Sequence, residues 1–332
     1  MVKVWTGVGV YRFEWRPFSW GTAGLGEGLG LDKGMRSALH RGHALLGVQL
    51  ILVATAAFLA YDTTRLWKAR LGLPLSHQLA TWAAAIGGLA LPLASPPHYL
   101  LRLLSIFLGT VPAYVLFSIA YEPLFLAVFG GALLAWLLAE ANLAGGSAGL
   151  ARGPAPPSTS ALAKEPLPSS PDAQAHRHTL QWADARLALA YLTFNNVAFF
   201  GTGNFASIAS FELSSVYRFT VQFNPFVMGA LLMIKLFIPL LLVACAFSAV
   251  LRLLRRPRFG IYLIVLLLSD VMSIHFFFMV CGVGSWMEIG NSLSRFGILN
   301  SQVLVVLLLF ALSHIYTWDL TYDGEAFLTK LL

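Results

Sequence analysis

Residues 226–250 read FVMGALLMIKLFIPLLLVACAFSAV, and this stretch decides the fold of the chain. Lys235 is its single charged residue, and no other strongly polar side chain interrupts the run. A helix needs about 20 predominantly apolar residues to cross the hydrocarbon core of a bilayer. The stretch therefore predicts a transmembrane helix rather than the core of a soluble domain.

The composition extends this interpretation to the whole chain. Of 332 residues, 58% are hydrophobic and 11% are charged, and the mean hydropathy is +0.73. Soluble domains average roughly 45–50% apolar and 25% charged residues. The sequence therefore predicts an all-α, polytopic transmembrane helix bundle.

Further apolar runs predict about eight spans. They cover residues 44–61, 78–94, 103–121, 123–139, 186–200, 226–250, 259–283 and 296–316. Glu122 alone separates the third run from the fourth, and Pro123 is suited to the first turn of a helix. A tight helical hairpin is expected there.

The spans divide the chain into four parts. Residues 1–43 show no clear domain, 44–143 hold the first four spans, 144–182 form a linker, and 183–320 hold four further spans. The linker is rich in Ala, Gly, Ser and Pro, a composition typical of disorder. His176 and His178 lie within it, but the pair lacks the acidic or thiol partners that would complete a metal site.

The net charge of +7 indicates membrane topology rather than nucleic-acid binding, because the basic residues stand singly or in short clusters at the ends of apolar runs. Cytoplasmic loops carry the excess of Lys and Arg. This rule places both termini, the linker and the 252–258 cluster in the cytoplasm. Residues 201–225 and 282–295 then face the lumen.

Ionisable residues inside the spans are candidate cavity or pathway residues, because an unpaired charge is costly there. Lys235, Asp270 and His275 are the cases here. If 226–250 and 259–283 form a hairpin, Lys235 pairs with Asp270 or His275, and we favour Asp270. Glu140 and Asp184 are expected to be solvated at span ends. Cys245 and Cys281 are expected to be buried thiols.

The predicted lumenal segments hold further candidates. Arg218 and Arg295 are candidate phosphate contacts, provided that the second segment, with Glu288 and Arg295, faces the first. Trp286 is either a lipid contact or an interfacial anchor. Residues 201–206 match G-x-G-x-x-A but follow a membrane span, so a nucleotide-binding fold is rejected.

Five groups of residues carry a family resemblance. They are Phe199–Asn204 with Ala206–Ile208 and Ser215–Tyr217; Asn224–Phe226 with Met228–Leu231; Lys235 with Ile238–Pro239; Ser269–Asp270 with His275–Phe278; and Gly284–Trp286 with Ile289–Gly290. In this order they resemble the C-terminal membrane domain of the GPI ethanolamine phosphate transferase 1 family. The resemblance adds Asn204 to the candidate substrate-binding residues. The first four spans resemble the family only in hydropathy.

The resemblance implies a multi-pass protein of the endoplasmic reticulum membrane. Members of the family transfer phosphoethanolamine from phosphatidylethanolamine to the first mannose of the GPI precursor. A lumenal domain that binds a divalent metal, expected to be zinc, does this chemistry, and nothing in this sequence resembles that domain. We therefore expect a fragment that has no cofactor of its own and is inactive alone, with both lipids and the missing catalytic domain as partners.

Two other functions remain open. A lipid transporter or scramblase would also use charges buried in spans, although the first and last four spans show no inverted repeat. A non-catalytic scaffold of the GPI pathway would need no substrate of its own.

Overall fold

The computed structural model describes residues 33–70, 72–97, 99–119, 122–151, 181–202, 213–280 and 282–318. Of residues 33–39, 144–151 and 213 it describes the backbone alone. Its helices are α1 (Lys33–Lys68), α2 (Leu75–Ala90), η1 (Leu91–Ala94), α3 (Tyr99–Phe117), α4 (Glu122–Ala151), α6 (Trp182–Gly201), η3 (Leu213–Arg218), α7 (Pro225–Leu253), α8 (Arg258–Phe278) and α9 (Trp286–Thr317). No strand occurs in these ranges.

The helices confirm the predicted all-α transmembrane bundle. Each predicted apolar run overlaps one of the α-helices, and within the described residues 6 helices are long and apolar enough to cross a membrane. α2 and α6 fall short of that limit, α2 because it has 16 residues. α4 continues to Ala151, into the segment predicted as a linker, whereas His176 and His178 lie outside the described residues.

α7 is the central helix of the bundle. It contacts α3, α4, α6 and α9, and 72% of its most apolar window is buried, against 17% for α1 and for α9. The Asn224 side chain caps its first turn by accepting from the backbone N–H groups of Phe226 and Val227. The stretch that decides the fold is therefore also the core around which the other helices pack.

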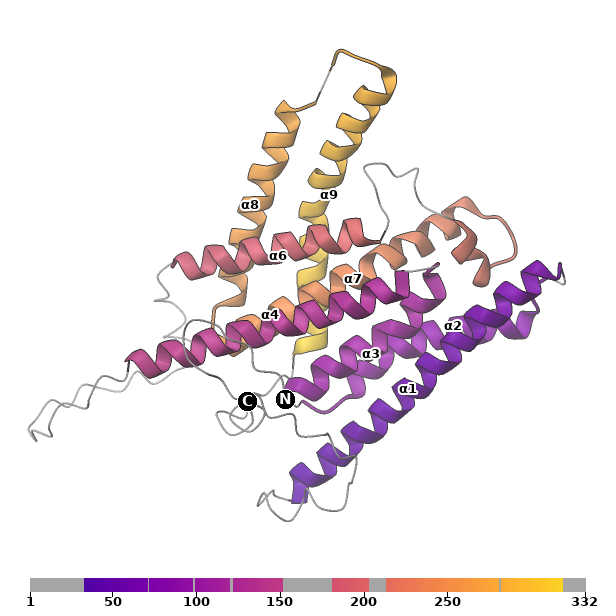
Figure 1. The fold of residues 1–332 in the computed structure, drawn as a ribbon, viewed down its shortest axis with the longest axis horizontal. Helices are drawn as coiled ribbons and strands as arrows, with labels where there is room; N and C mark the ends of the chain where they lie inside the picture. The colour runs from indigo at the N-terminus through magenta and orange to yellow at the C-terminus, as the bar shows by residue number, and fades with distance from the viewer. Residues whose placement is uncertain are drawn as a thin grey trace, which may run out of the picture.

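The helices on either side of α7 form two groups. α1, α2 and α3 pack on one another, and α8 packs against α6 and α9. Figure 1 shows α8 and α9 running steeply across the other helices. The C-terminal end of α8 and the N-terminal end of α9 project beyond the rest of the bundle. The predicted hairpin of adjacent α7 and α8 is wrong, because α8 turns away from α7 after the bend that contains Arg255 at φ 52°.

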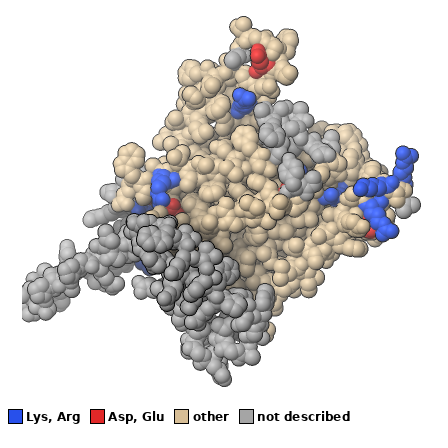
Figure 2. Space-filling view, in the orientation of Figure 1, with Lys and Arg blue, Asp and Glu red and all other residues tan. Residues whose placement is uncertain are grey.

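The surface is what a lipid-facing bundle requires. Figure 2 shows broad uncharged areas, with Lys, Arg, Asp and Glu confined to a few places. Many large apolar side chains are exposed, among them Ile51 and Phe58 on α1 and Leu124 and Val128 on α4. In a bilayer these side chains contact lipid tails.

Candidate functional site

The strongest polar feature is an ion pair buried between two helices. Lys235 Nζ on α7 lies 2.8 Å from Glu122 Oε1, and the two side chains are 6% and 14% exposed. Glu122 is the first residue of α4, directly after the tight turn from α3. The pair therefore ties the start of α4 to α7, in which Lys235 is the eleventh residue, about 15 Å along the helix from its first residue.

This geometry corrects the predicted partner of Lys235. Asp270 and His275 are both exposed on α8, and the structure does not bring either of them to Lys235. The predicted pairing assumed that α7 and α8 pack along their length. The two helices meet near the turn that joins them, where Tyr262 contacts Ser248 and Phe247, and α8 then turns away. Glu122 therefore takes the place of Asp270.

Glu122 also organises the turn that precedes it. Its second oxygen, Oε2, accepts from the backbone N–H of Ile119 at 2.7 Å. Tyr114, near the end of α3, is fully buried, and its hydroxyl makes no hydrogen bond within the described residues. The Glu122 carboxylate thus connects α4, α7 and the turn after α3. The buried Tyr114 hydroxyl lies near the same end of α3.

Arg218, the last residue of η3, covers the C-terminal end of α3. Its Nη1 donates to the carbonyl oxygens of Val115 (3.3 Å), Leu116 (2.8 Å) and Ser118 (2.9 Å). A helix C-terminus carries partial negative charge and stabilises a cation. Burial lowers the pKa of the Arg218 guanidinium, and the Glu122 carboxylate opposes that shift, so Arg218 stays charged at neutral pH.

Aromatic contacts hold η3 in this position. The rings of Phe219 and Phe117 stack with centroids 4.3 Å apart, and Trp82 Nε1 on α2 donates to the Phe219 carbonyl at 3.1 Å. Tyr217 packs against Trp67 of α1. The segment between α6 and α7 is thus fixed across the ends of α1, α2 and α3.

We call Glu122, Arg218 and Lys235 the polar cluster. It holds two cations and one carboxylate, so it carries one net positive charge. Such a site suits an anionic group, and the planar guanidinium of Arg218 matches the geometry of a phosphate. The sequence identified Arg218 and Lys235 but missed Glu122, whose signal was its place as the sole charge between two apolar runs.

The other predicted site residues lie elsewhere. Arg295 is exposed on α9, inside the helix rather than in a loop, and Trp286 is 90% exposed in the first turn of α9. Glu288 forms a capping box with Ser285 at the start of α9. Asn204 lies outside the described residues.

A second group of charges lies at the opposite end of α6 and α7. Asp184 is fully buried and lies 3.5 Å from Arg256, and Glu140, 4% exposed, pairs with Arg186 at 2.6 Å. Both carboxylates were expected to be solvated, and that expectation is wrong. The reason is that the start of α6 packs against α4 and the turn after α7: Arg186 of α6 reaches Glu140, and Arg256 of the turn reaches Asp184.

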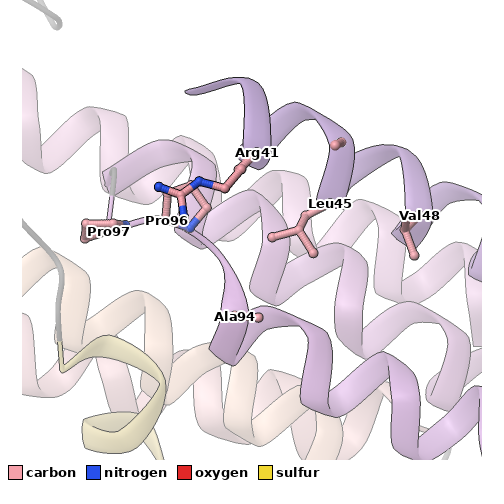
Figure 3. A pocket seen from close by; sticks show the side chains of 7 residues that line it. Arg41, Leu45, Val48, Ala94, Pro96 and Pro97 are labelled. Atoms are coloured by element: carbon pink, nitrogen blue, oxygen red, sulfur yellow. The ribbon is translucent and has the colours of Figure 1, made fainter. Parts of the chain in front are cut away.

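An apolar groove lies between residues 41–48 of α1 and the η1 segment with the residues that follow it. It has a volume of about 420 Å³ and is lined by Arg41, Ala44, Leu45, Val48, Ala94, Pro96 and Pro97. Figure 3 shows the Arg41 side chain lying beside Pro96 at one end of the groove. With this lining it suits an acyl chain better than a polar substrate.

Thiols and metal ligands add no further site. Cys245 is buried, as predicted, and Cys281 lies outside the described residues. Within the part of the chain that the structure describes, no three His, Cys, Asp or Glu side chains gather to hold a metal ion.

Comparison with known proteins identifies the family. No solved structure matches the chain. GPI ethanolamine phosphate transferase 1 of Homo sapiens is 36% identical over 275 residues, which is 81% of this chain and 28% of that protein. The Aspergillus oryzae protein of the same name is 36% identical over 298 residues, 85% of this chain and 29% of that protein.

The chain thus spans less than a third of the length of these relatives. The model of one family, phosphatidylinositolglycan class N (PIG-N), matches residues 17–285. That range covers all the helices from α1 to α8 together with the polar cluster. Because the family model matches far more than half of the residues of this chain, the chain belongs to the phosphatidylinositolglycan class N family.

Proposed function

We propose that this chain is the membrane portion of an endoplasmic-reticulum enzyme that transfers phosphoethanolamine from phosphatidylethanolamine to the first mannose of a GPI precursor. The family membership supports the proposal, as do the names of the human and fungal relatives. The transfer itself would belong to a metal-binding lumenal domain outside these residues, with zinc as the expected metal. This chain would hold the two lipids at the membrane surface beside that domain.

The polar cluster is the observation that carries this role. Glu122 and Arg218 lie at the ends of α3 and α4 that the charge distribution predicts to face the lumen, where the head groups of both lipids would be found. Phosphatidylethanolamine carries a phosphodiester. Arg218 is partly exposed, so its guanidinium would be accessible to such a group. Its Nη1 holds the end of α3, and its remaining N–H groups would donate to the phosphate.

A chimera tests the proposal. The matching segment of the human relative is replaced by this chain, and the product is expressed in human cells that lack their own enzyme. We expect the chimera to restore GPI-anchored proteins at the cell surface and labelled phosphoethanolamine on GPI lipids. The chain expressed by itself should restore neither.

Arg218→Gln in the chimera should lower the transfer rate about tenfold at limiting donor, because a charge-assisted hydrogen bond to phosphate contributes about that factor. Lys68→Met, which removes an exposed cation from α1, is the matched control and should leave transfer unchanged. Protein amounts are compared by immunoblot. A folded, correctly located chimera without transfer activity would refute the proposal, and rescue by the chain alone would refute the assignment of chemistry to another domain.

A further inference from the structure

Asp270 is out of place on the surface of α8. It is the thirteenth of 21 residues in this span, which puts it roughly 12 Å from the nearer helix end at about 1.5 Å per residue. The side chain is exposed, and no partner for it occurs within the described residues. Aspartate is too short to reach the membrane surface from this depth, as long Lys and Arg side chains do.

The residues around Asp270 form a continuous apolar face. The exposed side chains share one side of the helix, spaced three or four residues apart: Phe259, Leu263, Leu267, Val271, Ile274, Phe277 and Phe278. At about 100° per residue they cover an arc of roughly 120°, and Asp270 lies inside it. The buried Ile261, Tyr262, Val265, Ser269 and Ser273 occupy the other side.

Lipid can cover the apolar residues of this face but not the carboxylate, because hydrocarbon offers no hydrogen bond or counter-charge. Intramembrane carboxylates almost always face other protein and pair there. The charge of Asp270 therefore marks this face as one that protein covers, and it requires a cation or strong donor at the same depth.

This chain does not supply that cation from its described spans. Lys235 is paired with Glu122, and Arg102 donates to the carbonyls of Leu93, Ser95 and Tyr316. Arg295 of α9 is exposed, but the contact of Phe277 with Phe296 places it about two turns from the level of Asp270. A second copy is also disfavoured. Two copies inserted in the same orientation would meet face to face with their Asp270 carboxylates at equal depth, and like charges repel.

We propose that the Asp270 face of α8 docks a further transmembrane helix, from the part of the longer family enzyme outside these 332 residues, which carries a lysine or arginine at the depth of Asp270. The relatives have ample sequence for such a helix, since the chain covers 28% of the human protein. α9 offers a second polar group near this level. Contacts of Arg258 with His314 and of Phe277 with Phe296 set the register of the hairpin, and they place the exposed Asn300 within about a turn of Asp270.

Photocrosslinking in the human chimera described above tests the proposal. Benzoylphenylalanine is introduced at Leu267 or at Ile274, one turn on either side of Asp270. Phe58, 63% exposed within α1, is the matched control for a lipid-facing position. After irradiation, adducts are mapped by mass spectrometry.

We expect both α8 positions to crosslink to one apolar peptide outside the grafted chain that contains a lysine or arginine, and Phe58 to yield lipid adducts alone. Asp270→Lys should then lower the folded yield several-fold, and exchange of the crosslinked basic residue for Asp should restore it. Lipid adducts alone from α8, or a crosslinked dimer, would overturn the proposal. These readouts do not depend on transfer activity, so they stand apart from the test of the proposed function.

Discussion

At the scale of single residues, the bundle is held by charges that are buried in pairs. Desolvating two ions costs much of what their attraction returns, so a buried pair is weak evidence for a net gain in stability. Removing only one residue of the pair has a different effect, because the remaining ion keeps its desolvation cost and loses its partner. For Glu122 and Lys235 this distinction can be measured.

Lys235→Met should therefore destabilise the chain by roughly 3–5 kcal/mol, and Glu122→Leu by a similar amount. The double variant should be less destabilised than the sum of the two. The free energy of unfolding of the purified chain in mixed micelles, as a function of SDS, provides the measurement. Additive losses would show that the two side chains act independently, and Lys68→Met serves as the exposed control.

Asp184 combines two roles at the start of α6. Its Oδ2 accepts from the backbone N–H of Gln181 as part of a capping box, and Arg256 lies 3.5 Å from its Oδ1. α9 has a matching capping box in Ser285 and Glu288, but there the carboxylate is exposed and no ion pair is added.

Asp184→Ala should thus cost about 3 kcal/mol or more, because a cap and a buried ion pair are lost together. Glu288→Ala should cost roughly 1 kcal/mol as a cap alone. Thermal unfolding of both variants in the same detergent compares them. Equal shifts in Tm would contradict a contribution from Arg256.

Sequence alone went far toward these residues but not to their partners. An ionisable residue within an apolar run is visible in the sequence, and it identifies Lys235, Asp270 and His275 as candidates. Which of them meet depends on how helices far apart in the chain pack, and apolar periodicity does not encode that. Glu122 was missed because a carboxylate at a span end normally reaches water, whereas here α7 covers it.

At the scale of elements, α2 and α3 approach each other closely at two glycines. A Cβ at Gly88 would lie 2.7 Å from the Gly109 carbonyl oxygen, and one at Gly109 would lie 2.6 Å from that of Gly88 and clash with the Pro92 ring. Small residues let membrane helices approach until their backbones touch. The two glycines therefore fix the α2–α3 distance, and with it the end of α3 that Arg218 covers.

Gly109→Ala should destabilise the chain by roughly 1–3 kcal/mol, since neither the backbone of α2 nor the Pro92 ring can move aside easily. Gly131→Ala in α4 is the control, because nothing lies within 4 Å of a Cβ there. It should be neutral or stabilise by up to about 1 kcal/mol through helix propensity. SDS unfolding of both variants separates the outcomes, and equal effects would rule out a close contact.

At the scale of the whole molecule, the fold is a central helix with unequal surroundings. α7 is covered by α3, α4, α6 and α9, whereas the C-terminal end of α8 and the N-terminal end of α9 project from the bundle (Figure 1). Helix packing in lipid is driven by shape and polar contacts rather than by exclusion of water. A projecting hairpin with a carboxylate at mid-depth is consistent with a surface that other protein completes.

The orientation of this bundle in the membrane follows from its charges and can be tested on two turns. The α7–α8 turn carries Arg255 and Arg256, and the α8–α9 turn around Ser285 carries no Lys or Arg, so the first should be cytoplasmic and the second lumenal. Arg255 and Ser285 are both exposed, so a cysteine at either position would be open to reagents. With Cys281 replaced by Ser, an impermeant maleimide added to sealed microsomes should label Arg255→Cys. It should label Ser285→Cys only after the membrane is opened with detergent. Buried Cys245 gives the background of the parent chain. The opposite pattern would place the polar cluster on the cytoplasmic side, away from any lumenal catalytic domain, and the proposed function would have to be abandoned.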